Sequence, residues 1–177
     1  MTRLSRSTLD ILGDLIRFDT TSFRSNLALI DYIASYLASY DIQPEIIYDE
    51  KGEKANLLAF VGPTDRPAIL LSGHTDVVPV DGQNWTVPPF NLTVKDGKAY
   101  GRGTCDMKGF IACALAALPF FLEGDLDYAI GFAFSYDEEV GCAGVGSLLK
   151  LLTDRNIPVR ACIIGEPSSM KPVTAHT

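Results

Sequence analysis

The sequence has little histidine, little cysteine and no cluster of positive charge. Its 177 residues include two histidines and four cysteines, and 22 acidic against 15 basic residues give a net charge of −7. Without a Lys/Arg cluster, nucleic acid and anionic membranes are poor candidates for partners. The cysteines form no C-x-x-C pair, which argues against a disulfide framework and against a zinc site made of thiolates.

Long hydrophobic runs are also missing from the sequence. The most apolar segment, FIACALAALPFFL at 110–122, is interrupted by Pro119 and is shorter than the roughly 20 residues that cross a bilayer. The opening residues, MTRLSRSTLD, contain no apolar stretch of the signal-peptide type. The 47% of hydrophobic residues suffice for a core. Because the sequence indicates no disulfide framework, signal peptide or membrane span, we expect a reduced, cytoplasmic protein.

Hydrophobic periodicity predicts helices and strands in alternation. Ser7 and Asp10 have the spacing of a capping box before a first helix, and Asp96-Gly97 is typical of a hairpin turn. Further helices are predicted at 26–39, 107–121 and 145–156, and strands at 45–50, 56–62, 68–73, 128–136 and 161–165. The last two strands are expected to be buried. This order indicates an α/β fold, with a mostly parallel central sheet flanked by helices and an antiparallel hairpin.

Acidic residues and one histidine follow the ends of three predicted strands and one glycine-rich turn. These residues are His74, Asp76, Asp106, Glu138, Glu139 and Glu166. Open α/β sheets place their ligand crevices outside the carboxyl ends of the strands. The sequence therefore predicts that these segments converge on one crevice.

Crowded carboxylates must either take up protons or bind cations when they are partly desolvated. Two divalent ions would neutralise most of this charge, and mixed imidazole and carboxylate ligands suit zinc or a neighbouring transition metal. No D-x-D-x-D-G calcium loop is present. Asp76, two residues after His74, is expected to accept the N–H of the second ring nitrogen of that histidine.

Each candidate residue also has a purely structural interpretation. His74 could be a hydrogen-bonded histidine of the core, and Asp106 could be a helix cap. Glu138 and Glu139 could be an exposed strand end, and Glu166 could be a loop charge. Their shared position at the ends of strands and turns favours the metal site.

Two further residues are excluded from the candidate site. Cys105 lies beside Asp106, and we expect it to be a small buried residue rather than a thiolate ligand. His176 lies in the last segment of the sequence, KPVTAHT, and is interpreted as incidental.

The motifs of residues 71–167 resemble the di-zinc amidohydrolase family. They are SGHTDVVPVDGQNW, PPF, DGKAYGRGTCDMKGFIA, DEEVG and GEPS, in the family's order. That family contains acetylornithine deacetylase, succinyl-diaminopimelate desuccinylase, aminoacylases and several carboxypeptidases. The segments GRGTCDMKGFIA and DEEVGCAG are most similar to those of the acetylornithine deacetylases, with the desuccinylases next.

The resemblance implies two zinc (or cobalt) ions in a complete active site. The residues that it makes metal ligands are His74 and Glu166 for the first ion, Glu139 for the second, and Asp106 as the bridge. It implies two catalytic residues, Asp76 behind His74 and Glu138 as the general base. The implied reaction is metal-dependent hydrolysis of the amide bond of a small N-acyl amino acid.

The resemblance favours N-acetylornithine as substrate, which would give ornithine and acetate in arginine biosynthesis. The alternatives are a succinyl-diaminopimelate desuccinylase or another N-acyl amino acid hydrolase and, in a different class, a metal-binding fragment without catalysis. In the family, the second ion has a further histidine ligand from a downstream motif, and His176 does not match that motif. Family members also have a lid domain through which two chains form a homodimer. We therefore expect residues 1–177 to be the N-terminal part of the catalytic domain, without the lid, and to be inactive alone.

Overall fold

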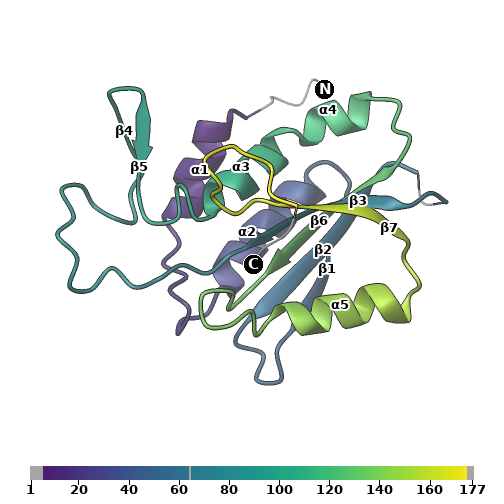
Figure 1. The fold of residues 1–177 in the computed structure, drawn as a ribbon, viewed down its shortest axis with the longest axis horizontal. Coiled ribbons are helices and arrows are strands. Elements are labelled where there is room, and N and C mark those ends of the chain that lie inside the picture. Colours follow the sequence, from purple (N-terminus) through teal and green to yellow (C-terminus); the bar gives the residue numbers. More distant parts are fainter. Residues whose placement is uncertain (1–5, 64, 175–177) are drawn as a thin grey trace.

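A five-stranded sheet lies between two layers of helices in the computed structural model, which describes residues 6–63 and 65–174 (Figure 1). In spatial order the strands are β1 (Glu45–Tyr48), β2 (Ala55–Val61), β6 (Ala129–Ser135), β3 (Ala68–His74) and β7 (Val159–Ile164). β2 runs antiparallel to β1 and β6, whereas β3 is parallel to both β6 and β7. Four of the five strands therefore share one direction, which confirms the predicted mostly parallel α/β sheet.

The helices cover the two faces of the sheet unequally. They are α1 (Thr8–Ile16), α2 (Leu27–Ala38), α3 (Lys108–Ala116), α4 (Leu118–Glu123) and α5 (Val145–Asp154). Side chains alternate between the faces of a strand. In β6, Phe132 and Phe134 accordingly pack in the core with α1–α4, while Ala133 packs in a smaller core with Leu148 and Leu152 of α5. Among the described residues, no helix has the length and apolar character needed to cross a membrane.

Local signals explain the start of α1 and the hairpin. The Ser7 hydroxyl oxygen accepts a hydrogen bond from the Asp10 N–H at 3.2 Å, and the Asp10 carboxylate accepts one from the Ser7 N–H at 3.2 Å. This confirms the predicted capping box. Between β4 (Thr93–Lys95) and β5 (Lys98–Tyr100), Asp96 and Gly97 have φ of 52° and 71°. Both residues are left-handed, as a two-residue hairpin turn of type I′ requires, and the predicted hairpin is confirmed.

The single helix predicted at 107–121 is wrong, because α3 ends and α4 begins at Ala117. Pro119 has no N–H and its ring collides with the carbonyl four residues earlier, which is that of Leu115. The Leu115 carbonyl instead accepts a hydrogen bond from the Tyr36 hydroxyl of α2 at 3.1 Å. Pro119 therefore divides the segment without leaving this buried carbonyl unpaired.

The prediction that the last strand is buried is also wrong. All six residues of β7 are exposed, with Ile163 at 51% and Ile164 at 63%. The reason is the strand's place at the edge of the sheet, since α5 packs against β2 and β6. The other strand predicted as buried, β6, is buried along its whole length, which confirms that prediction.

Candidate metal centre

Parallel pairing brings three strand ends to one edge of the sheet. In the register of the sheet, His74 at the end of β3 pairs with Ser135 at the end of β6, and Ser72 pairs with Ile164 at the end of β7. The segments that leave these strands therefore begin side by side, as crevices at strand ends require. The structure brings together the metal-ligand candidates that the sequence predicted to converge, as well as Glu138, in two groups whose ligand atoms lie within 4.8 Å of one another.

His74 lies at the floor of this cluster and is 2% exposed. Its Nε2 atom lies 3.0 Å from Asp106 Oδ1, 3.6 Å from Glu166 Oε1 and 3.8 Å from Glu138 Oε2. The side chains of Asp106 and Glu166 are 47% and 43% exposed, so these carboxylates remain open to solvent. The arrangement is a buried nitrogen donor beneath accessible oxygen donors.

The donor atoms form two overlapping groups. One contains His74, Asp106 and Glu139, and the other contains His74, Glu138 and Glu166. The sequence analysis had instead combined His74 with Asp106 and Glu166 for its first ion. His74 belongs to both groups, so its imidazole is the shared element of the cluster.

The hydrogen bond on the far side of the ring fixes the His74 tautomer. His74 Nδ1 lies 2.9 Å from the main-chain oxygen of Asp76, and a carbonyl oxygen can only accept. Nδ1 therefore carries the proton, and in the neutral ring the lone pair of Nε2 faces the carboxylates. Facing lone pairs of this kind favour a bound proton or metal cation between them. The Asp76 carboxylate lies farther from Nδ1, at 3.4 Å, so the predicted partner is corrected to the carbonyl of the same residue.

The pKa values at the cluster show the effect of crowded carboxylates. Burial by itself would lower the pKa of His74, but the Asp76 carboxylate beside the ring and the charge of Glu166 raise it to about 9. Burial, followed by the charge of Asp106, raises the pKa of Glu139. Burial also raises the pKa of Glu166 and outweighs the opposing charge of His74. In the absence of metal the cluster thus favours bound protons, which is how like charges respond when no cation is present.

The Asp76 carboxylate joins the end of β3 to the segment after β6. Its Oδ2 accepts from the Ser22 hydroxyl at 2.7 Å and from the Glu139 N–H at 3.2 Å, and its Oδ1 accepts from the Glu138 N–H at 3.0 Å. Burial opposes the charge, yet the neighbouring His74 ring and the hydrogen bond from Ser22 lower the pKa of Asp76. Sequence reasoning missed Ser22, because no motif marks a residue 54 positions away from its partner.

Lys108 anchors the start of α3, directly after the segment that carries Asp106. The peptide bond from Asp106 to the fully buried Met107 is cis. The Lys108 ammonium group, also fully buried, donates to the carbonyls of Leu15 at 3.1 Å and Phe18 at 2.7 Å. Burial lowers the pKa of Lys108 to about 7. Sequence reasoning missed this lysine, although it belongs to the motif DGKAYGRGTCDMKGFIA, which could have marked it as a candidate.

The structure describes one of the two residues that were excluded from the site. Cys105 is exposed, so the expectation that it is buried was wrong, and it belongs to neither group. His176 lies outside the described residues.

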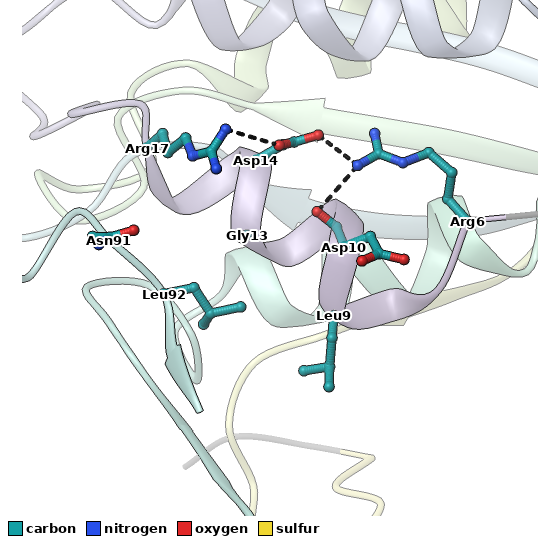
Figure 2. Close-up of a pocket in the computed structure, with 8 residues that line it drawn as sticks. All are labelled: Arg6, Leu9, Asp10, Gly13, Asp14, Arg17, Asn91 and Leu92. Carbon is teal, nitrogen blue, oxygen red and sulfur yellow. Dashed lines mark hydrogen bonds and ion pairs between the residues drawn. The ribbon is translucent and has the colours of Figure 1, made fainter. Parts of the chain in front are cut away.

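A shallow cavity elsewhere on the molecule contains none of the candidate residues. It has a volume of about 260 Å³ and lies beside α1 (Figure 2). Its lining residues are Arg6, Leu9, Asp10, Gly13, Asp14, Arg17, Asn91 and Leu92. Asp14 pairs with Arg6 at 2.7 Å and with Arg17 at 3.4 Å, so the positive charges beside this cavity already face a carboxylate.

Comparison with known proteins identifies the class to which this fold and this cluster belong. Residues 70–176 match Peptidase family M20/M25/M40. This match spans more than half of the sequence, and the chain belongs to that family.

Two relatives and one solved structure illustrate the similarity. An acetylornithine deacetylase of Myxococcus xanthus is 41% identical over 170 residues, which are 93% of this chain and 43% of that protein. A succinyl-diaminopimelate desuccinylase of Rickettsia rickettsii (strain Sheila Smith) is 35% identical over 173 residues, which are 93% of this chain and 45% of that protein. The crystal structure of human carnosine dipeptidase 1 superposes with a TM-score of 0.77 and 25% identity, covering 89% of this chain and 38% of that one. The chain thus spans about two-fifths of the length of the proteins that it matches.

Proposed function

We propose that this chain carries the metal-binding part of an amidohydrolase that cleaves N-acyl amino acids. The observation that carries the proposal is the buried His74 Nε2 facing carboxylates of three separate segments, with Asp106 Oδ1 at 3.0 Å. Membership of a family of metal-dependent peptidases supports it. Bound divalent ions, which we propose to be two zinc or cobalt ions, would supply Lewis-acid activation of water and of the acyl carbonyl.

The proposed ligands are the four side chains to which the family resemblance gives this role, and all four belong to the donor groups of the cluster. They are His74, Asp106, Glu139 and Glu166, with Asp106 as the bridging carboxylate. One neutral imidazole with several carboxylates suits zinc and its neighbours in the transition series. The His74 hydrogen bond to the Asp76 carbonyl supports this assignment, because it directs the unprotonated nitrogen at the carboxylates.

Glu138 is proposed as the general base. Its carboxylate is 37% exposed at the rim of the cluster, where it can reach both water and a substrate. It would take a proton from the attacking water and return it to the departing amine, as one carboxylate can do in successive steps. Asp76 is proposed to act behind the site by holding His74 and the main chain of Glu138 in place.

N-acetylornithine is the proposed substrate, with ornithine and acetate as products. Support comes from the 41% identity to the deacetylase of Myxococcus xanthus. Succinyl-diaminopimelate is the second candidate, because the Rickettsia rickettsii desuccinylase is 35% identical over a similar span. We further propose that residues 1–177 are the N-terminal part of a catalytic domain whose complete protein is a homodimer.

Comparing turnover of the two substrates tests the proposed specificity. The full-length gene product, loaded with zinc, is assayed on N-acetylornithine and on N-succinyl-diaminopimelate at equal concentration. The proposal predicts a higher kcat/KM for N-acetylornithine. A higher value for the succinyl substrate would favour the second candidate, and no cleavage of either would contradict both proposed substrates.

A further inference from the structure

The segment that carries Glu138 and Glu139 begins with a strained residue. Asp137 is the second residue after the end of β6 and has a φ of 56°, in the left-handed region that few residues other than glycine adopt. This conformation orients the main chain that enters the next two residues. Such a turn keeps one orientation only when the surrounding structure holds it.

Lys54 forms an ion pair with Asp137 that holds it in place. Its ammonium group donates to the Asp137 carboxylate and to the main-chain carbonyl of Ser22. Both charged side chains are only 16% exposed, so this ion pair is largely withdrawn from solvent. Removing one member of such a pair leaves the other charge unpaired in a poorly solvated place.

The contacts continue from Ser22 back to the same turn and close a ring. The Ser22 hydroxyl donates to the Asp76 carboxylate, which accepts in turn from the N–H groups of Glu138 and Glu139. The turn is thus held by the ion pair of Asp137 with Lys54 and by the hydrogen bonds that Asp76 accepts from its main chain. Ser22 contacts both Lys54 and Asp76, so a continuous set of hydrogen bonds joins these two residues.

We propose that Lys54 and Asp137 are positioning residues for the candidate metal centre, and that their ion pair sets where the Glu138 and Glu139 carboxylates lie. This inference rests on the proposed function, in which these carboxylates are the base and a ligand. Lys54 itself donates to Asp137 and Ser22 rather than to a donor atom of the cluster, and it acts through the turn. Displacement of a ligand by about 1 Å is enough to cost on the order of a hundredfold in a positioned site.

Two variants of the 177-residue chain test the proposal, and an exposed ion pair provides the control. Lys54→Met and Asp137→Asn each remove one charge of the pair. Lys150→Met and Asp154→Asn make the same changes in a pair on α5, whose side chains are 73% and 58% exposed. Two properties are measured: amide hydrogen exchange of Glu138 and Glu139 by NMR in the metal-free chain, and the affinity and visible absorption spectrum of bound Co²⁺.

We expect either variant of the Lys54–Asp137 pair to speed exchange at Glu138 and Glu139 by about tenfold or more, while β6 keeps its protection. We expect Co²⁺ to bind about 10–100-fold more weakly, with an altered spectrum. The double variant Lys54→Met/Asp137→Asn is expected to resemble the single ones, because each alone breaks the pair. The control variants are expected to leave both properties unchanged.

Unchanged exchange at Glu138 and Glu139 in both variants would overturn the proposal, whatever the metal does. Exchange accelerated equally along β6 would also overturn it, because the pair would then stabilise the whole fold rather than the turn. The wild-type chain could bind no Co²⁺ while the variants still exchange faster at Glu138 and Glu139. That result would support the role of the ion pair in holding the turn and would contradict the proposed function instead.

Discussion

His74 is the one imidazole that the described residues bring to the cluster, and its protonation links the site to stability. In the metal-free fold its pKa is about 9, whereas a histidine in an unfolded chain titrates near 6.5. The folded state therefore holds an extra proton between these values. This contribution to stability is complete below pH about 6.5 and is lost as the pH rises through 9.

We predict that the free energy of unfolding of the metal-free chain falls more steeply between pH 6.5 and 9 than that of His74→Gln. The comparison is needed because Lys108 acts in the opposite direction. Burial lowers its pKa to about 7 from about 10.4, so its contribution to stability increases as the pH rises through that range. Urea unfolding of both proteins at a series of pH values measures the difference, and identical pH dependence would contradict the protonation of His74.

Glu138 has a role that can be separated from metal binding. We predict that Glu138→Gln in the full-length gene product keeps its zinc content and loses about 10²–10⁴-fold in kcat, because an amide cannot take up the proton. Metal analysis and steady-state kinetics on one preparation measure both quantities. Nearly normal turnover at full zinc occupancy would remove Glu138 from the role of base.

At the scale of elements, the fit of the Asp106 segment against α3 depends on a glycine. A Cβ atom on Gly109, the second residue of α3, would lie 2.2 Å from the main-chain oxygen of Thr104. The backbone of the segment before Asp106 would have to move away. Gly146, the second residue of α5, offers a matched position where a Cβ would meet nothing within 4 Å.

We predict that Gly109→Ala lowers the free energy of unfolding by about 1–3 kcal/mol, the usual cost of overpacking, and weakens zinc binding. Gly146→Ala should be neutral or stabilising by up to about 1 kcal/mol, because alanine favours a helix over glycine. Denaturant unfolding and zinc titration of both variants test this. Equal effects of the two substitutions would show that the contact with Thr104 does not constrain the segment.

The elements that the sequence predicted well are those set by local interactions. The capping box at Ser7 and the turn at Asp96-Gly97 depend on neighbouring residues, and both were confirmed. The helix break was also signalled locally, by Pro119, and an interpretation based on hydrophobic periodicity overlooked it. The exposure of β7 had no local signal, because the strand's composition does not reveal that it lies at the edge of the sheet.

The same distinction applies to the candidate site. Its ligands could be predicted because each follows a strand end or a motif, and parallel strands bring such ends together. Ser22 and Lys54 could not be found in this way. Their partners, Asp76 and Asp137, lie 54 and 83 residues away, and only the folded chain brings them into contact.

At the scale of the whole molecule, a net charge of −7 and a cluster of carboxylates at one edge of the sheet both favour cations. The donors are unevenly shared in the proposed assignment. One ion would have His74, Asp106 and Glu166, whereas the second would have only Asp106 and Glu139 among the described residues. A zinc site usually has at least three protein ligands, so the second ion should bind more weakly.

Zinc binding by the 177-residue chain is the most direct test of the central claim that this cluster is a metal centre. Equilibrium dialysis followed by metal analysis compares the wild-type chain with His74→Ala, and Gly146→Ala serves as a folded control. We predict about one tightly bound zinc ion per chain and a second, weaker one for the wild type and the control, and loss of the tight ion in His74→Ala. A wild-type chain that binds no zinc, or a His74→Ala variant that binds it equally well, would contradict the account.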